Sequence, residues 1–116
     1  MAVWEAEALH AMFDGCADYT RRPFTAGGQR LEAVFLDGLT SGGDIAELVL
    51  RPMMQTILPG SMDEVLHQAE RCAAWCASME QARSAGETAD RLCHGYCAVL
   101  FPGTGKALCF ETKTSV

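Results

Sequence analysis

The chain has 116 residues and a formal net charge of −6 at pH 7; 49% of its residues are hydrophobic and 21% are charged. These values are typical of a globular protein with a single domain. They argue against nucleic-acid binding, because neutralising phosphates requires clustered Lys and Arg. No apolar run approaches the ~18 to 20 residues of a membrane helix, and the acidic N-terminus is unlike a signal peptide. We therefore expect one soluble domain over residues 1–116.

The chain contains six cysteines, and their surroundings favour free thiols over disulfides. Cys72 and Cys76 fall on the apolar side of a predicted helix, whereas Cys97 and Cys109 lie within apolar, strand-like runs. Free Cys behaves as a small buried hydrophobe, and a protein that is not exported stays reduced. We expect reduced thiols in the core.

The N-terminal third is predicted to form a helix followed by a hairpin. Apolar side chains at spacings of three and four predict a helix over residues 3–19, which Pro23 would end. Residues 24–39 contain Gly27-Gly28, a pair that favours a hairpin turn. The apolar run within residues 30–36 predicts a strand that is buried on both faces.

A Gly/Ser loop follows this strand and leads into a helical region. Ser41 or Asp44 is the expected cap of the first short helix, and Pro52 should end or restart that helix. A capping box at residues 61–64 opens the longest predicted helix, whose apolar side extends to Met79.

The C-terminal third is predicted to contain one more helix and a second hairpin. Residues 84–87 repeat the capping-box pattern, and Gly95 fits the end of the helix that they begin. Residues 96–101 and 106–112 predict two strands joined by a tight turn. The order of all these elements predicts an α/β (α+β) fold, in which about four helices cover a small mixed β-sheet.

Enzyme motifs do not fit the sequence. The segment 102–107 is similar to a phosphate-binding loop, but Leu100 and Ala107 stand where that loop needs Gly and Ser or Thr. We expect a hairpin turn there instead. His10 and Asp14, one helical turn apart, are expected to make an ordinary surface contact. We predict that the protein is not an enzyme and needs no cofactor.

A series of short phrases runs in fixed order from Asp18 to Lys113. The phrases are Asp18-Tyr19-Thr20-Arg21-Arg22, Phe35-Leu36-Asp37-Gly38-Leu39, Ile45, Val49-Leu50, Pro52-Met53, Leu92-Cys93-His94-Gly95, Val99-Leu100-Phe101, Ala107-Leu108 and Thr112-Lys113. In this order and spacing the chain resembles the GerA family, the A subunits of bacterial spore germinant receptors. The family phrase Arg-x-x-x-Glu-Pro and the family's membrane helices are absent from these residues.

The resemblance implies a non-enzymatic signalling and assembly role in spore germination. The chain would be the first N-terminal subdomain of an A subunit, on the cytoplasmic (spore core) face of the inner spore membrane. Its expected partners are a second, similarly folded subdomain, the B-type and C-type subunits, and a small-molecule germinant. The candidate binding residues, taken from family motifs and the Gly/Ser loop, are Asp18, Arg22, Asp37, Gly38, Ser41 and Asp44.

Other interpretations of these residues stay open. The loop at residues 40–44 could hold an amino acid or an anion on its backbone amides, as a small-ligand-binding domain would. Asp18 and Arg22, at helical spacing, could instead pair with each other. A Cys-rich metal-binding protein is a further alternative, although the Cys72–Cys76 and Cys93–Cys97 pairs lack the two-residue spacing of structural zinc sites. We predict no metal site.

Overall fold

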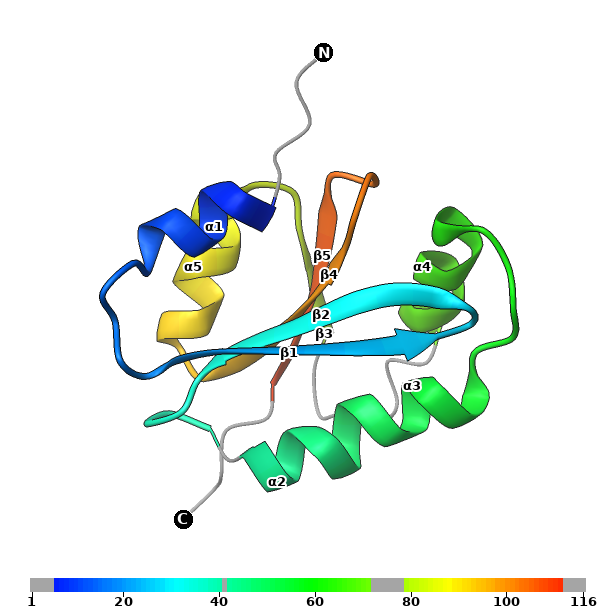
Figure 1. Ribbon diagram of the computed structural model, residues 1–116, viewed down its shortest axis with the longest axis horizontal. Helices are drawn as coiled ribbons and strands as arrows, with labels where there is room; N and C mark the ends of the chain where they lie inside the picture. The colour runs from blue at the N-terminus through cyan, green and yellow to red at the C-terminus, as the bar shows by residue number, and fades with distance from the viewer. Residues whose placement is uncertain (1–5, 41, 72–78, 112–116) are drawn as a thin grey trace.

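The computed structural model describes residues 6–40, 42–71 and 79–111, which form a five-stranded sheet with helices on both faces (Figure 1). The elements in chain order are α1 (Ala6–Met12), β1 (Tyr19–Ala26), β2 (Gln29–Leu36), α2 (Gly42–Ile45), the π-helical segment η1 (Ala46–Leu50), α3 (Arg51–Thr56), α4 (Met62–Arg71), β3 (Met79–Ala82), α5 (Ala85–Cys93), β4 (Tyr96–Phe101) and β5 (Lys106–Glu111). If α2, η1 and α3 are counted as one run, the described residues form four helices. The predicted α/β (α+β) class is confirmed.

The strands follow the order β1-β2-β4-β5-β3, and each neighbouring pair is antiparallel. The predicted mixed sheet is therefore corrected to an antiparallel one. The two hairpins β1–β2 and β4–β5 explain much of this, because a tight turn can join only antiparallel strands. Strand β2 lies inside the sheet between β1 and β4, as its apolar sequence predicted.

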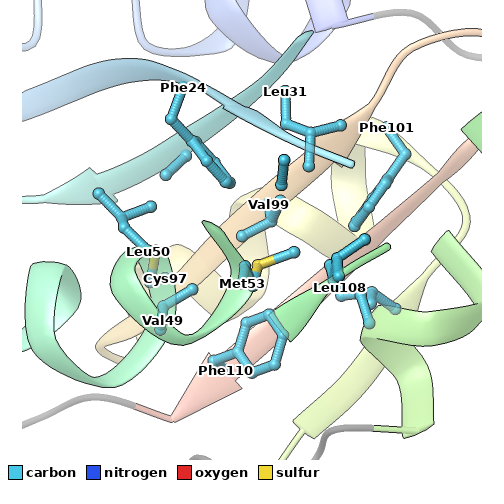
Figure 2. Packing of buried hydrophobic residues seen from close by; sticks show 14 of the residues in the cluster. Phe24, Leu31, Val49, Leu50, Met53, Cys97, Val99, Phe101, Leu108 and Phe110 are labelled. Atoms are coloured by element: carbon cyan, nitrogen blue, oxygen red, sulfur yellow. The ribbon is translucent and has the colours of Figure 1, made fainter. Parts of the chain in front are cut away.

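Side chains alternate across each strand, so the sheet has two apolar faces with different helices on them. The first face is covered by α2, η1, α3 and α4, and the second face by α1 and α5. Figure 2 shows part of the first-face cluster, in which the labelled residues are Phe24, Leu31, Val49, Leu50, Met53, Cys97, Val99, Phe101, Leu108 and Phe110. The second-face cluster is Leu9, Val34, Ala82, Ala89, Leu92, Tyr96, Ala98, Leu100, Ala107 and Cys109.

The first helix is shorter than the predicted 3–19. It ends at Met12, and Gly15 turns the chain with a φ of +82° before β1 begins at Tyr19. Pro23 lies within β1 rather than at a helix end. This position suits proline because β1 is an edge strand, where one missing N–H need not interrupt pairing. The hairpin turn at Gly27-Gly28 is confirmed, and both residues have positive φ.

Pro52 restarts the helix without a break in the helical run. Segment η1 ends immediately before α3, and the Arg51 N–H donates to the carbonyl oxygen of Ala46, five residues earlier. A π-turn of this kind accommodates Pro52, which has no N–H to give to the preceding turn. Figure 1 shows α2 and α3 as successive parts of one helical run along the edge of the molecule.

The predicted capping box at the start of α4 is complete, and at the start of α5 Ser84 caps the helix while Glu87 accepts from the Arg83 N–H instead of the Ser84 N–H. The Glu64 N–H donates to Ser61 Oγ, and the Ser61 N–H donates to Glu64 Oε1. In α5 the Glu87 N–H donates to Ser84 Oγ, and Gly95 ends the following turn with a φ of +88°. These local signals correctly locate the starts of α4 and α5.

The predicted extension of the longest helix to Met79 is wrong. Met79 begins strand β3, which pairs with β5 so that Met79 lies opposite Phe110. Two apolar residues, Met79 and Ala82, are compatible with either helical or strand spacing, and the pairing with β5 selects the strand. Cys72 and Cys76 lie outside the described residues, whereas Cys97 and Cys109 are buried free thiols, as expected.

Candidate functional site

Three of the candidate residues meet at the open end of the β1–β2 hairpin. Asp18 precedes β1 and Asp37 follows β2, so antiparallel pairing places them side by side. The Asp37 N–H donates to the carbonyl oxygen of Asp18 at 2.9 Å. A Cβ atom added to Gly38 would lie 3.3 Å from Asp18 Oδ2. Gly38 therefore leaves room for the Asp18 carboxylate beside the turn.

Arg22 lies in β1, four residues after Asp18, and its side chain extends toward the start of α2. Its guanidinium carbon lies 5.8 Å from the centre of the Phe35 ring, a cation–π arrangement. Its Nη2 lies 3.6 Å from the position that a Cβ on Gly42 would occupy. In the described part of the chain, Arg22 forms no ion pair.

The proposed pairing of Asp18 with Arg22 is not formed. That pairing assumed a helix, in which residues four apart lie on one face. Residues 19–26 form a strand instead, so the two residues are separated by about 13 Å of extended chain. The structure thus groups Asp18 with Asp37 and Gly38, and places Arg22 beside Phe35 and Gly42.

The remaining two candidates belong to the Gly/Ser loop. Asp44 is the third residue of α2, so it lies inside the helix and not before it, where a cap would stand. The residue is half-buried. Ser41 is outside the described residues, and its capping role stays a prediction. Thr40, immediately before it, is buried.

The chemistry of this end of the hairpin is that of an exposed polar surface. The side chains of Asp18, Arg22 and Asp37 are exposed, and the backbone between the two strands is fully paired there. Two carboxylates and one guanidinium offer acceptors and a planar donor group to a partner or a small ligand. These residues form two separate parts of the hairpin surface: Asp18 with Asp37 and Gly38, and Arg22 with Gly42 further along β1. We call the two parts together the hairpin-end site.

A second polar cluster, which the sequence did not predict, lies on the second face of the sheet. The ring nitrogens of His10 bind other residues than the predicted Asp14: Nδ1 lies 2.6 Å from the Tyr19 hydroxyl, and Nε2 lies 2.9 Å from Glu32 Oε1. Arg21 Nε donates to Glu32 Oε2 at 3.0 Å. The Gly27-Gly28 turn sets the register of β1 and β2 and therefore determines which of their side chains share a face. This register is the sequence feature from which the cluster could have been predicted.

The structure also shows where the cysteines of the metal-site alternative and the loop similar to a phosphate-binding motif lie. Cys93 is exposed on α5 whereas Cys97 is buried in β4, so the two thiols lie in different environments. Among the described residues, no three His, Cys, Asp or Glu side chains are placed to hold a metal ion. The segment 102–105 joins β4 to β5 as a hairpin turn, as predicted. Within the described ranges, no helix has the length and apolarity needed to cross a bilayer.

Comparison with known proteins gives a match in fold. No family model and no curated protein matches the sequence. The structure is similar to the crystal structure of the N-terminal domain of the A subunit of the Bacillus megaterium spore germinant receptor GerK3, with a TM-score of 0.64. The match covers 95% of this chain and 91% of that chain at 12% sequence identity. The resemblance to the N-terminal region of such A subunits, predicted from short phrases, is confirmed at the level of the fold.

Proposed function

We propose that this chain is a non-enzymatic signalling and assembly domain of a spore germinant receptor A subunit. The observation that carries the proposal is a fold likeness that extends over nearly the whole of both chains. The ordered sequence phrases between Asp18 and Lys113 support the same assignment independently, because they are a property of the sequence and not of the fold. A fold alone does not specify a function, so the agreement of the two observations is what favours this role.

In this role the domain passes a ligand-induced change between neighbouring parts of the receptor. Its partners would be a second N-terminal subdomain and the B-type and C-type subunits, on the cytoplasmic face of the inner spore membrane. The hairpin-end site is the surface that we assign to these contacts. It is exposed, it carries both signs of charge, and it includes the residues of two family phrases.

Germination of spores that carry altered alleles tests the proposal. Arg22→Glu reverses the charge of the basic side chain in the hairpin-end site, and we expect it to slow germination by about tenfold because it replaces an attraction to an acidic group of the partner with a like-charge contact. The matched control is Arg30→Glu, the same change at an exposed arginine near the closed end of the same hairpin. Germination is followed as the fall in optical density of the spore suspension.

Two outcomes would contradict this account. Equal germination of the Arg22→Glu and Arg30→Glu spores would remove the hairpin-end site as a contact surface. Normal germination, with every germinant that the parent strain uses, after deletion of the whole domain would remove the receptor role itself.

A second candidate function is binding of a small carboxylate or other anion, such as an amino acid germinant. The observation that favours it is the Arg22 guanidinium, held over Phe35 beside Gly42 without a carboxylate partner in the described residues. Calorimetry with a panel of amino acids and inorganic phosphate tests it, with Arg22→Gln as the comparison. Heat that the variant abolishes would support this function; silence at millimolar ligand would exclude it for this domain.

A further inference from the structure

Strand β1 has one side in the sheet and one side open. It stands first in the order β1-β2-β4-β5-β3, so among the described residues β2 is the strand that it pairs with. Figure 1 shows β1 as a long outer strand beside β2. It has 8 residues, whereas β3, at the other edge of the sheet, has 4. The backbone N–H and C=O groups along an open edge are a template for a further strand.

The turn at Gly27-Gly28 determines which backbone groups of β1 face the open side. Ala26 and Gln29 flank this two-residue turn and are paired, so they exchange both backbone hydrogen bonds. Even-numbered residues of β1 therefore bond to β2, and odd-numbered residues direct their N–H and C=O groups outward. Pro23 occupies an outward position, where its missing N–H leaves the pairing with β2 intact.

Two outward N–H groups are open to a partner. The Tyr19 N–H donates within the chain, to the carbonyl oxygen of Cys16 at 3.2 Å. In the described part of the chain, the N–H groups of Arg21 and Thr25 have no such acceptor. Residues 21–23 and Thr25 are exposed, so no described element covers this length of the edge. An incoming strand can therefore accept from Arg21 and Thr25 and donate to the outward carbonyl oxygens.

The open edge is basic, although the chain as a whole is acidic. Strands β1 and β2 contain three arginines, Arg21, Arg22 and Arg30, and one acidic residue, Glu32, whereas the formal net charge of the chain is −6. Glu32 pairs with Arg21. Arg22 and Arg30 are exposed and form no ion pair with any described residue. The edge thus carries positive charge that the described chain does not compensate.

We propose that the open edge of β1 binds an extended acidic segment of a partner protein, which adds to the five-stranded sheet as a further strand. Main-chain hydrogen bonds at Arg21 and Thr25 hold the segment. Its carboxylates lie on the first face beside Arg22, where opposite charges on neighbouring strands attract. Such binding requires only the geometry and charge of the edge, and it holds whether or not the domain belongs to a receptor.

Charge distinguishes this partner from a second copy of the chain. Pairing of two β1 strands about a two-fold axis would bring the arginines of one copy close to those of the other. Like charges at such positions are destabilising. Proline and charged side chains protect an edge from strands of its own kind. An acidic strand, in contrast, gains from the same arginines.

Addition of an acidic peptide tests the edge. The probe is an acetylated and amidated peptide of alternating glutamate and valine, about nine residues long, which can span β1 as one strand. Backbone amide signals are followed by NMR while the peptide is added to about 1 mM. We expect the largest shifts, and slower hydrogen exchange, at Arg21 and Thr25. Amides of β3, at the other edge, should not change.

A variant and its control test the charge. Arg22→Gln should weaken binding of the peptide by about three- to tenfold. The matched control Arg83→Gln, at an exposed arginine that follows β3, should bind as the unaltered chain does. A peptide with lysine in place of glutamate should bind at least about tenfold more weakly. Equal binding of the glutamate and lysine peptides would overturn the proposed acidic partner.

Methylation of the peptide backbone separates strand addition from simple attraction of charges. Methyl groups on the nitrogens of two adjacent central residues block both edges of the peptide and leave its charge unchanged. This peptide should bind at least about tenfold more weakly. Equal binding, or no binding of the unmethylated peptide at about 1 mM, would overturn the proposal. Protection of Arg21 and Thr25 that rises with protein concentration, without peptide, would assign the edge to a second copy instead.

Discussion

The two faces of the sheet differ in the side chains that they carry. The first face carries large apolar side chains, among them Phe35, Phe101 and Phe110, beneath the continuous run α2–η1–α3 and α4. The second face carries more alanine, under the shorter α1 and α5, and ends in the polar cluster around His10. The first face is therefore held by tight apolar packing, whereas the second face also contains contacts of a titratable histidine.

Removal of a large side chain from the first face should have the largest effect on stability. Phe110 is fully buried in the first-face cluster. Phe110→Ala should lower the free energy of unfolding by about 3–5 kcal/mol, because it loses apolar burial and leaves a cavity. Urea denaturation measures this loss. A loss below about 1 kcal/mol would mean that the first face is not the stabilising one.

The hairpin tip gives a smaller effect with an internal control. At Gly27, with a φ of +59°, an added Cβ would lie 2.7 Å from Val65 Cγ2 and 2.8 Å from Ile57 Cγ2. At Gly28, with a φ of +76°, nothing lies within 4 Å. Gly28→Ala should therefore lower the free energy of unfolding by about 1–2 kcal/mol, the cost of a left-handed backbone for a residue with a Cβ. Gly27→Ala should lower the free energy of unfolding by more, because its Cβ would also clash. Equal losses in urea denaturation would show that the tip does not pack tightly on the first face.

The start of α4, on the first face, should lose stability in a different pH range from the second face. Hydrogen bonds from the Ser61 N–H and hydroxyl hold the pKa of Glu64 below its ordinary value of 4.5. The stabilisation is present above pH 4.5 and is lost as the pH falls through the lower, folded-state pKa. On the second face, the His10 contribution is lost at a higher pH, below 6.5.

Urea denaturation across pH 3 to 7 separates the two contributions. Glu64→Gln should remove part of the pH dependence below pH 4.5 and leave the region between pH 5 and 6.5 unchanged. A change confined to the higher region would contradict the assignment of that contribution to His10.

The smallest expected effect concerns the thiols, which report on burial without altering the fold. Burial raises the pKa of Cys109 to about 12, and Cys97 is also buried, whereas Cys16 and Cys93 are exposed. Because the thiolate is the reactive form, an alkylating reagent at pH 8 should label Cys16 and Cys93 in the native protein. Cys97 and Cys109 should react only after unfolding. Peptide mass spectrometry maps the sites, and rapid native labelling of Cys109 would contradict the closed core.

Local signals explain what could be predicted from the sequence. The Gly27-Gly28 turn, the caps at Ser61 and Ser84, and the stop at Gly95 each depend on a few adjacent residues, and each is found in place. The β4–β5 hairpin was predicted for the same reason.

Long-range pairing explains what could not be predicted. Pro23 was interpreted as a helix end because its place on an edge strand depends on the order of strands. Met79 lies in a strand because it pairs with β5, which is distant in the sequence. The contact of His10 with Glu32 depends on the register between β1 and β2. Of the candidate site, Asp18, Asp37 and Gly38 come together as neighbours of that same hairpin, while Arg22 occupies a separate place beside Phe35.

The central proposal is that this domain is part of a spore germinant receptor A subunit, and the sequence of its gene past the codon for Val116 tests the proposal most directly. We predict a second α/β region that begins near an Arg-x-x-x-Glu-Pro phrase, followed by several apolar helices of ~20 residues. A stop codon directly after Val116 would contradict the proposal.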